Sequence, residues 1–415
     1  MSYTQDLGIR AKAAEPAVSA ASSALKDAAL AAIARALREN AQEIIAENAK
    51  DLAAADENGV SKAMQDRLRL DEGRIEGMAK GVDELIALAD PVGSVIGGGS
   101  RPNGLRIIKT RVPLGVIGII YESRPNVTVD AAALCLKAGN CVILKGGKEA
   151  INSNICLGRI MRRAIEESGL PADAVQVVEN TSREITNELM QLRGYLDVLI
   201  PRGSARLIQA VVNTAKVPVI ETGAGNCHVY VDASADLGMA VEITDNAKTQ
   251  RPSVCNAIET LLVHKDIADT FLPAIAERFK AHDVKIYGCD RTIAVLGDGV
   301  EKATETEYAT EFNDFVIAVK VVDSVDEAIE HIRKYSTKHS ECIVTSSLAN
   351  AEKFQCEVDA AAVYVNASTR FTDGGEFGFG AEIGISTQKL HARGPMGLTE
   401  LTTVKYLVSG NGQIR

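Results

Sequence analysis

The feature that most constrains the fold of this chain is a regular alternation of short apolar runs with segments of helical periodicity. The apolar runs are bounded by turn residues and are rich in Val and Ile, so they predict strands. Strands that are apolar on both faces and alternate with helices are typical of a parallel sheet covered on both sides. The first series of expected strands is 116–121, 141–144, 175–178, 198–200 and 217–220. The helices expected between them are 129–138, 154–168, 185–192 and 204–214.

A second series of the same kind begins near His228. Its expected strands are 258–263, 315–322, 342–344 and 362–365, and its expected helices are 237–248, 267–279 and 325–334. Ahead of the first series, an Ala-rich segment predicts two helices over 17–58, joined near Asn40, and a third over 72–88. The glycines at 97–99 indicate a hairpin over 95–112, and the tail ends in the strand-like run 401–408. The expected fold class is therefore α/β.

Composition excludes several classes of function. The net charge is −10, there is no basic cluster, and aromatic residues make up 4% of the chain, so nucleic acid is not expected as a partner. None of the eight cysteines forms a Cys-x-x-Cys pair, which argues against a zinc or disulfide framework, and no metal site is expected. No apolar run is long enough to span a membrane and no export signal is recognisable. A cytoplasmic location is the simplest expectation.

Cys255 is the strongest candidate for a reactive group. It lies between an expected helix and the expected strand 258–263, where a thiol can be presented to a cleft. Lys248 and Arg251 are close in sequence, and neighbouring cations favour the nucleophilic thiolate. The alternative is that Cys255 is one of several small buried cysteines.

Glu221 is a second candidate, because it follows the expected strand 217–220 and opens Glu221-Thr-Gly-Ala-Gly-Asn226. The carboxyl ends of parallel strands are where α/β folds bind ligands. A solvated loop acid is the alternative.

A Glu-x-Gly-x-Gly-Asn element 34 residues before a cysteine (255 − 221 = 34) resembles the aldehyde dehydrogenase superfamily. The resemblance is closest to its γ-glutamyl phosphate reductase family. It rests on motifs that occur in order along nearly the whole chain: Asp66-Arg-Leu-Arg-Leu70, the segment 112–128 with Tyr121-Glu-Ser-Arg-Pro-Asn126, Val142-Ile-Leu-Lys-Gly-Gly-Lys148, Lys248-Thr-Gln-Arg-Pro252, Tyr335-Ser-Thr-Lys-His339 and Val365-Asn-Ala-Ser-Thr-Arg370.

The resemblance implies a fold, an activity and a chemistry. The fold would be aldehyde dehydrogenase-like. The activity would be NADPH-dependent reduction of L-glutamyl 5-phosphate to L-glutamate 5-semialdehyde with release of phosphate, the second step of proline biosynthesis. Cys255 would attack the acyl phosphate to form a thioester, which hydride then reduces. Asn126 and the Cys255 backbone N–H would stabilise the oxyanions, and a turn residue after Pro125 is the alternative role of Asn126. Glu221 would handle a proton or position a group, since activating water would hydrolyse the thioester.

The resemblance also assigns binding residues. For NADP(H) it implies Lys145 and Lys148 at the ribose, Gly203 and Ser204 at the cofactor phosphates, and Glu311 at the nicotinamide ribose. Two solvated lysines are the alternative reading of the first pair. Arg124, Arg251 and Arg370 are candidates for the phosphate and carboxylate of the substrate, with surface ion pairs as their alternative role. His339 is expected to be structural, at a turn between a helix and a strand.

The expected domains follow from this assignment. Residues 1–95 and 113–226 would bind NADP, 227–388 would form the catalytic domain, and 96–112 with 389–415 would pair as an oligomerisation arm. A homo-oligomer and a functional association with glutamate 5-kinase are the expected partners beyond the small-molecule substrate and inorganic phosphate. Two other functions stay open: an oxidising semialdehyde dehydrogenase that uses Glu221 to hydrolyse the thioester, and a cofactor-binding protein with an inactive site.

Overall fold

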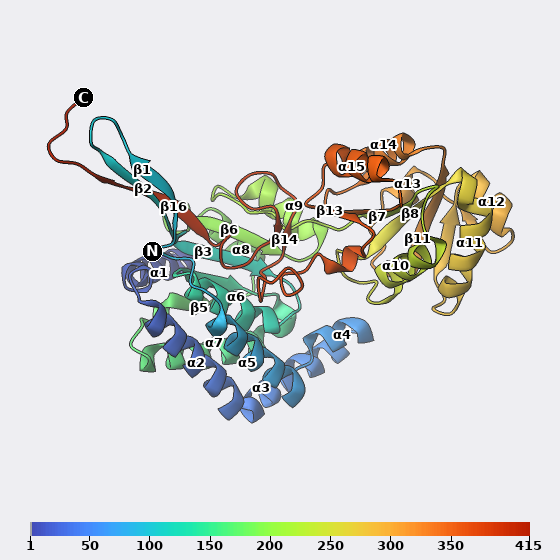
Figure 1. Cartoon of the computed structure of the whole chain (residues 1–415). Helices are drawn as coiled ribbons and strands as arrows, with labels where there is room; N and C mark the ends of the chain where they lie inside the picture. The colour runs from blue at the N-terminus through green and yellow to red at the C-terminus, as the bar shows by residue number, and fades with distance from the viewer. Residues whose placement is uncertain (1) are drawn as a thin grey trace. The chain divides into compact units, whose positions relative to one another are not determined.

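The computed structural model describes residues 2–415, apart from the side chain of Ala63, and divides into two compact units. The first unit comprises Met1–Thr222, Gly378–Gly384 and Met396–Arg415, and the second comprises Gly223–Phe377 and Ile385–Pro395. The tail therefore contributes to both units. Figure 1 follows the chain through them by colour.

The first unit is built on a four-stranded parallel sheet in the order β5-β4-β3-β6. Its strands are β3 (Val116–Tyr121), β4 (Cys141–Lys145), β5 (Val175–Val177) and β6 (Val198–Arg202). Every residue of β3 and β4 is buried, which is the burial that their uninterrupted apolar sequence predicts. The helices α6 (Asn126–Lys137) and α7 (Ile151–Glu167) pack against the sheet.

Five helices precede this sheet in the chain. They are α1 (Tyr3–Ser19), α2 (Ser23–Glu39), α3 (Ala41–Glu57), α4 (Lys62–Leu68) and α5 (Glu72–Ala87). The expected break at Asn40 is present, and its side chain donates to the Ala36 carbonyl at the end of α2. The sequence did not predict α1, which continues through Pro16 in its last turn. It also did not predict the short α4.

The prediction of a strand over 217–220 was wrong. This segment makes only an isolated parallel bridge between Val219 and Leu199 of β6. The Leu199 N–H donates to the Pro218 carbonyl and the Ile220 N–H donates to the Leu199 carbonyl. Pro218 has no N–H to donate, so this short segment does not extend into a ladder. Two further helices, α8 (Arg183–Met190) and α9 (Ala205–Thr214), flank β6 in sequence.

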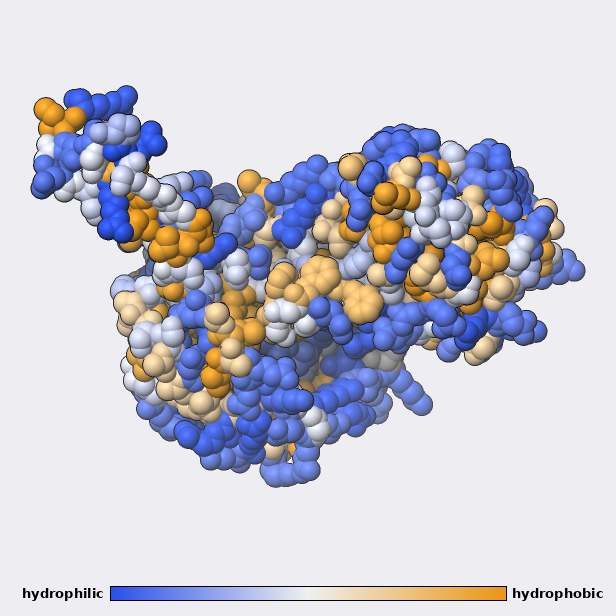
Figure 2. Space-filling view, viewed as in Figure 1, coloured by the Kyte–Doolittle hydropathy of each residue, from blue (hydrophilic) through white to orange (hydrophobic). Residues whose placement is uncertain are grey.

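A three-stranded antiparallel arm belongs to the first unit, in the order β1-β2-β16. It joins β1 (Val95–Ser100) and β2 (Arg106–Pro113) to β16 (Thr402–Ser409), so the predicted hairpin does pair with the tail. Figure 1 shows these strands side by side near the C-terminus. All of β1 and nearly all of β16 are exposed, and Figure 2 shows hydrophobic residues among polar ones on the arm.

The second unit contains a seven-stranded sheet in the order β10-β9-β11-β8-β7-β12-β13, in which every pairing is parallel. Its strands are β7 (Cys227–Val231), β8 (Ile258–His264), β9 (Lys285–Gly288), β10 (Glu301–Lys302), β11 (Val316–Val322), β12 (Ser340–Val344) and β13 (Ala362–Val365). The central strands β7 and β8 thus have β12 and β13 on one side, and β11, β9 and β10 on the other.

Helices cover both faces of this sheet. Inward residues of α10 (Leu237–Thr249) and α11 (Lys265–Lys280) form one apolar core with the strands, and those of α14 (Val325–Tyr335) and α15 (Leu348–Glu357) form another. The sequence missed α15, β9, β10, α12 (Asp290–Leu296) and α13 (Glu305–Tyr308). These missed elements are mostly short and carry many polar residues, so their periodicity is weak. A small pair, β14 (Ile385–Ser386) with β15 (Gly394–Pro395), completes the fold. None of the described helices is long and apolar enough to cross a membrane.

Candidate active site

Cys255 lies in the turn that follows α10 and precedes β8, as the sequence predicts. Its side chain is partly buried, whereas Cys135, Cys141, Cys156, Cys227 and Cys342 are fully buried. Burial raises the pKa of Cys227, Cys135 and Cys342, which keeps those thiols protonated and poorly reactive. Burial thus separates Cys255 from these five cysteines, although Cys289 is also partly buried and Cys356 is exposed.

The backbone beside Cys255 is held by close packing. A Cβ at Gly225 would overlap the Cys255 carbonyl oxygen, so glycine is required at that position. The Gly225 N–H donates to Glu311 Oε1 at 2.6 Å, and Glu311 comes from the loop between α13 and β11. Glu311, predicted for the nicotinamide ribose, is thus tied to the segment that packs on the nucleophile.

Two of the three predicted substrate arginines are close to Cys255. Arg370 is partly buried, and its guanidinium donates to Asn256 Oδ1 and, at 3.0 Å, to Gln250 Oε1. Burial lowers the pKa of Arg370 and the neighbouring charge of Arg251 lowers it further, whereas Asp373 and, to a smaller extent, Cys255 raise it. Two cations thus act near the thiol, which is the environment that stabilises a thiolate and attracts an anionic substrate.

Asn256 anchors this arginine and was not singled out from the sequence. Its Nδ2 donates to the carbonyls of Arg370 and Thr372, at 3.2 and 2.9 Å, and its own carbonyl accepts from Thr369 Oγ1 at 2.7 Å. Its position directly after Cys255 was the only signal in the sequence.

Lys248 does not supply the cation that its sequence position suggested. Its ammonium and the Glu259 carboxylate are completely buried and form an ion pair of 2.6 Å. Glu259 Oε1 also accepts from the Asn313 N–H at 3.0 Å. Burial raises the pKa of Glu259 to about 7 and lowers that of Lys248, with each partner opposing the shift of the other. The pair links the end of α10 to β8, on both sides of the loop that carries Cys255.

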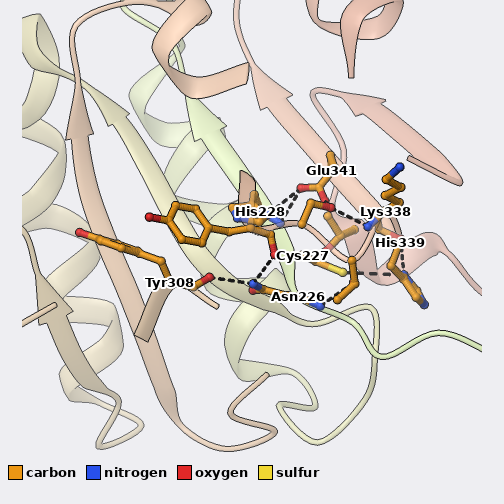
Figure 3. A network of polar contacts seen from close by, with 12 residues as sticks. Asn226, Cys227, His228, Tyr308, Lys338, His339 and Glu341 are labelled. Carbon is orange, nitrogen blue, oxygen red and sulfur yellow. Dashed lines mark hydrogen bonds and ion pairs between the residues drawn. The ribbon is translucent and has the colours of Figure 1, made fainter. Parts of the chain in front are cut away.

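A polar network lies at the start of β7 (Figure 3). The Cys227 thiol donates to the Cys255 carbonyl at 3.1 Å, and His339 Nδ1 lies 3.7 Å from Cys227 Sγ and 2.8 Å from Ser340 Oγ. Burial lowers the pKa of His339 to about 4, so the imidazole is neutral at pH 7. These contacts agree with the expectation that His339 is structural.

The neighbouring residues of β7 are fixed in the same way. Asn226 Nδ2 donates to the carbonyls of Tyr308 and Tyr335, at 2.8 and 2.9 Å. The backbone N–H of His228 donates to Glu341 Oε2 at 2.9 Å, and His228 Nδ1 lies 2.9 Å from the same oxygen. Figure 3 shows these side chains converging from separate segments of the second unit. They tie Asn226 and the start of β7 to other segments of the second unit.

Asn126, the predicted oxyanion donor, is the first residue of α6 in the first unit. The expected helix begins three residues earlier than the sequence indicated, at 126 instead of 129. The exposed Asn126 side chain donates from Nδ2 to Asp130 Oδ2 at 3.0 Å, one turn along the helix. Burial raises the pKa of Asp130 to about 6, although Asn126 and Arg202 both favour its charged form. Asp130 orients the carboxamide and leaves its second N–H proton available.

The two predicted ribose lysines differ in environment. Lys145, the last residue of β4, is buried, and its Nζ donates to the Gly146 carbonyl at 2.9 Å. Burial lowers the pKa of Lys145. Lys148 is exposed, at the start of a short 3-10 turn, Lys148–Ala150. A Cβ at Gly147 would overlap the Glu149 carboxylate, so an acid lies among these cations.

Ser204 caps α9, with its Oγ accepting from the Leu207 N–H at 3.4 Å. The sequence did not predict that this turn already holds an anion. Glu122, which follows β3, accepts from the Ser204 N–H at 2.7 Å and from Ser204 Oγ at 3.1 Å. Gly203 lies against the same carboxylate, because a Cβ there would be 2.5 Å from Glu122 Oε2.

The remaining predicted residues are Glu221 and Arg124, both in the first unit. Glu221 is partly buried directly after the bridge to β6. Arg124 is exposed after β3 and follows Ser123, whose φ of 32° is unusual for a residue with a side chain. Among residues 2–415 no group of three or more His, Cys, Asp or Glu is arranged to hold a metal ion.

Comparison with known proteins identifies the family. The aldehyde dehydrogenase family model matches residues 8–292. The gamma-glutamyl phosphate reductase of Clostridium novyi is 60% identical over 413 residues, which cover 100% of this chain and 99% of that protein. The gamma-glutamyl phosphate reductase of Moorella thermoacetica is 60% identical over 411 residues, which cover 99% and 98%.

Solved structures give the same result. The crystal structure of gamma-glutamyl phosphate reductase from Thermotoga maritima is 51% identical, with a TM-score of 0.98 and complete coverage of both chains. An acetylating aldehyde dehydrogenase from Geobacillus thermoglucosidasius shares the fold, with a TM-score of 0.71 at 19% identity over 99% and 97% of the two chains. The chain therefore belongs to the aldehyde dehydrogenase family and, within it, to the group of the gamma-glutamyl phosphate reductases.

Proposed function

We propose that this protein reduces L-glutamyl 5-phosphate to L-glutamate 5-semialdehyde with NADPH and releases phosphate, as the second step of proline biosynthesis. The observation that carries the proposal is the 60% identity, along the whole chain, to proteins named gamma-glutamyl phosphate reductase. The local structure is compatible, because a partly buried thiol with two arginine charges nearby suits an acyl phosphate that carries negative charge.

Cys255 is the nucleophile in this proposal. Its thiolate attacks the acyl carbon of the substrate, a C–S bond forms, the C–O bond to phosphate breaks, and inorganic phosphate leaves. When bound, the nicotinamide supplies the hydride that reduces the thioester. The resulting thiohemiacetal collapses to the aldehyde and returns the free thiol. Arg251 and Arg370 bind the departing phosphate or the substrate carboxylate, and Arg124 is the third candidate for these groups.

Oxyanion stabilisation falls to Asn126 and to the Cys255 backbone N–H. The Asn126 carboxamide is already oriented by Asp130, so one N–H direction is fixed before substrate arrives. Donors that are set in advance stabilise the tetrahedral oxyanion without a reorganisation cost. The Cys255 backbone is similarly constrained by Gly225 and by the Cys227 thiol.

Glu221 has a proton-handling or positioning role in this proposal and does not activate water. Water attack on the thioester would release glutamate and waste the acyl phosphate. A reductase that releases phosphate must therefore keep this carboxylate from acting as the base for hydrolysis.

The residues of the first unit suit a dinucleotide cofactor. The turn at Gly203 and Ser204 binds a carboxylate through a backbone N–H and a hydroxyl, and the same donors suit the anionic phosphates of a cofactor. Gly146 and Gly147 permit close approach of the chain after β4. The exposed Lys148 and, less directly, the buried Lys145 provide cations for the 2′-phosphate of NADP, although Glu149 opposes them. Glu311 would hold the nicotinamide ribose.

A homo-oligomer built through the arm and a functional association with glutamate 5-kinase complete the proposal. The arm has the exposed strands that such an assembly requires. The association follows from the chemistry, because an acyl phosphate hydrolyses readily and benefits from transfer at short range.

The reaction run from the aldehyde tests the proposal. Purified protein is supplied with glutamate 5-semialdehyde and NADP, and NADPH absorbance is followed with and without inorganic phosphate. We expect phosphate-dependent NADPH formation that is lost in Cys255→Ala and kept in Cys356→Ala, a matched control at an exposed cysteine. NADPH formation without phosphate would instead support the hydrolytic dehydrogenase. Cofactor binding without turnover would support an inactive binding protein.

A further inference from the structure

We propose that the Glu122 carboxylate is an internal competitor of the cofactor, bound to the donors at the start of α9 that the cofactor diphosphate requires. The inference rests on the proposed function, because it takes Gly203 and Ser204 as the cofactor-phosphate turn. It assigns a role to an acid that no prediction from the sequence included. It concerns contacts within the first unit alone.

The geometry of the contact is that of a bound anion. One carboxylate oxygen of Glu122 accepts from the Ser204 N–H at 2.7 Å, and the other accepts from Ser204 Oγ at 3.1 Å. Gly203 packs on the first oxygen, where a Cβ would come within 2.5 Å. The glycine therefore provides the close approach by which a phosphate is usually accommodated, and here a carboxylate occupies it.

The charge of the helix explains why the carboxylate is held there. The N-terminus of a helix carries partial positive charge and unpaired N–H groups. The first turn of α9 contains no acidic residue of its own, so Glu122 supplies the anion from another segment. Charge-assisted hydrogen bonds of this kind are stronger than neutral ones.

The backbone of Glu122 is fixed, so only its side chain has to move. The Glu122 N–H donates to the Arg202 carbonyl at 3.2 Å, where β3 continues beside the end of β6. Rotation of the side chain releases the two donors without disturbing the sheet. A diphosphate and a carboxylate cannot use them together, because like charges at this separation repel.

The consequence is a lower apparent affinity for the cofactor. Only the fraction of molecules in which Glu122 has rotated away offers the Ser204 donors, and the apparent dissociation constant rises in proportion. Neutralising the carboxylate weakens its hold on the donors and removes the repulsion. We expect Glu122→Gln to lower the dissociation constant of NADPH about three- to ten-fold.

Direct binding tests the inference. NADPH fluorescence is titrated with wild type, Glu122→Gln, Glu122→Ala and Glu184→Gln. Glu184→Gln is the control, because it makes the same charge change at an exposed acid in the first turn of α8. Tighter binding in both Glu122 variants, with no change in the control, is the expected result. Thermal unfolding of each variant verifies that it is folded.

Two results would overturn the inference: an unchanged or weaker affinity in folded Glu122→Gln, or equal tightening in Glu184→Gln. The reductase assay on the same wild-type preparation separates this from the proposed function. Wild type that binds NADPH without phosphate-dependent turnover contradicts the proposed function alone. Absence of NADPH binding in all four proteins contradicts both.

Discussion

His331 is a buried histidine on α14 whose surroundings oppose its protonation. Burial lowers the pKa of His331 to about 2, and His228, Lys320 and Lys334 add positive charge in the same direction. Its ring meets Tyr308 edge-on and packs against Tyr335, with centroids 4.9 and 4.5 Å away. The imidazole is therefore a neutral part of the core across the physiological range.

This environment predicts a loss of stability in mild acid. The folded-state pKa lies below the unfolded value of about 6.5, so the unfolded chain binds a proton first as the pH falls. The contribution of neutral His331 to the unfolding free energy is fully present above about pH 6.5 and decreases below it, by about 2 kcal/mol between pH 7 and pH 5. We expect His331→Leu to reduce the pH dependence of the unfolding free energy by about that amount.

Urea unfolding at the two pH values provides the measurement. His282→Leu is the control, since His282 is an exposed histidine in the same unit. An identical pH dependence in wild type and His331→Leu would contradict the assignment.

The residues of the site illustrate how far a sequence predicts single side chains. Cys255, Arg251 and Arg370 were predicted from residue type and resemblance, and the structure places them in one unit with mutual electrostatic effects. Glu122, Asp130 and Asn256 were not predicted. The partner of Glu122 lies 82 residues away and that of Asn256 lies 114 residues away, so neither contact leaves a local pattern.

At the scale of elements, α10 and β8 are joined by a buried ion pair across the loop of Cys255. Removing one partner leaves an uncompensated charge in the core, whereas removing both does not. We expect Lys248→Met to lower the unfolding free energy by about 3–5 kcal/mol. We expect the double variant Lys248→Met, Glu259→Met to recover most of that loss, apart from the hydrogen bond to the Asn313 N–H.

A double-mutant cycle in urea measures the coupling. Turnover of the same variants shows whether the ion pair positions Cys255, because Lys248 and Glu259 lie on either side of the loop that carries it. Recovered stability without recovered turnover would mean that the ion pair orients the loop. A loss of unfolding free energy in the double variant that equals the sum of the two single losses would contradict the coupling.

Gly225 is the contact point between the segment that enters β7 and the loop of Cys255. An added Cβ would overlap the Cys255 carbonyl oxygen, and backbone cannot yield as a flexible side chain does. We expect Gly225→Ala to shift the loop and to lower turnover by about 100-fold, the typical effect of a displacement near 1 Å.

The matched control for this substitution is Gly81→Ala in α5, where an added Cβ meets open space. That variant should keep its turnover and gain about 0.5–1 kcal/mol of stability, since alanine favours the helix. Measurement of kcat and of thermal unfolding for both variants tests these two expectations. Unimpaired turnover in Gly225→Ala would show that the close approach has no catalytic role.

Element boundaries show why the fold was easier to predict than its details. The strands 116–121 and 362–365, the first fully and the second partly buried, were predicted to the residue, because uninterrupted apolar runs have sharp ends. The segment 217–220 was mistaken for a strand, since its apolar character reflects burial beside β6 without a ladder. The start of α6 was missed because Pro125 precedes it, and proline can open a helix as well as end one.

At the scale of the whole molecule, each unit has its own sheet and the chain returns to the first unit at its end. The residues 396–415 add β16 to a hairpin formed nearly 300 residues earlier. This pairing exposes a row of large apolar side chains, Val404, Tyr406 and Val408, on one face of β16, with Arg111, Lys109 and Ile107 of β2 opposite them in that order. The other face of β16 carries Thr403, Lys405 and Leu407, of which Leu407 is 45% exposed.

An exposed apolar strand of this kind predicts contact with a second copy of the chain. Val404, Tyr406 and Val408 are 38%, 60% and 57% exposed, which is unusual for a row of large side chains on one face. We expect Val404→Lys to weaken the oligomer, because a buried unpaired ammonium is costly. Thr403→Lys makes the same charge change on the opposite face and should leave the oligomer intact.

Light scattering after size exclusion, at several concentrations, gives the mass of each variant, and circular dichroism verifies that the arm stays folded. A wild-type mass equal to one chain would contradict the oligomer, and dissociation by Thr403→Lys alone would assign the interface to the other face.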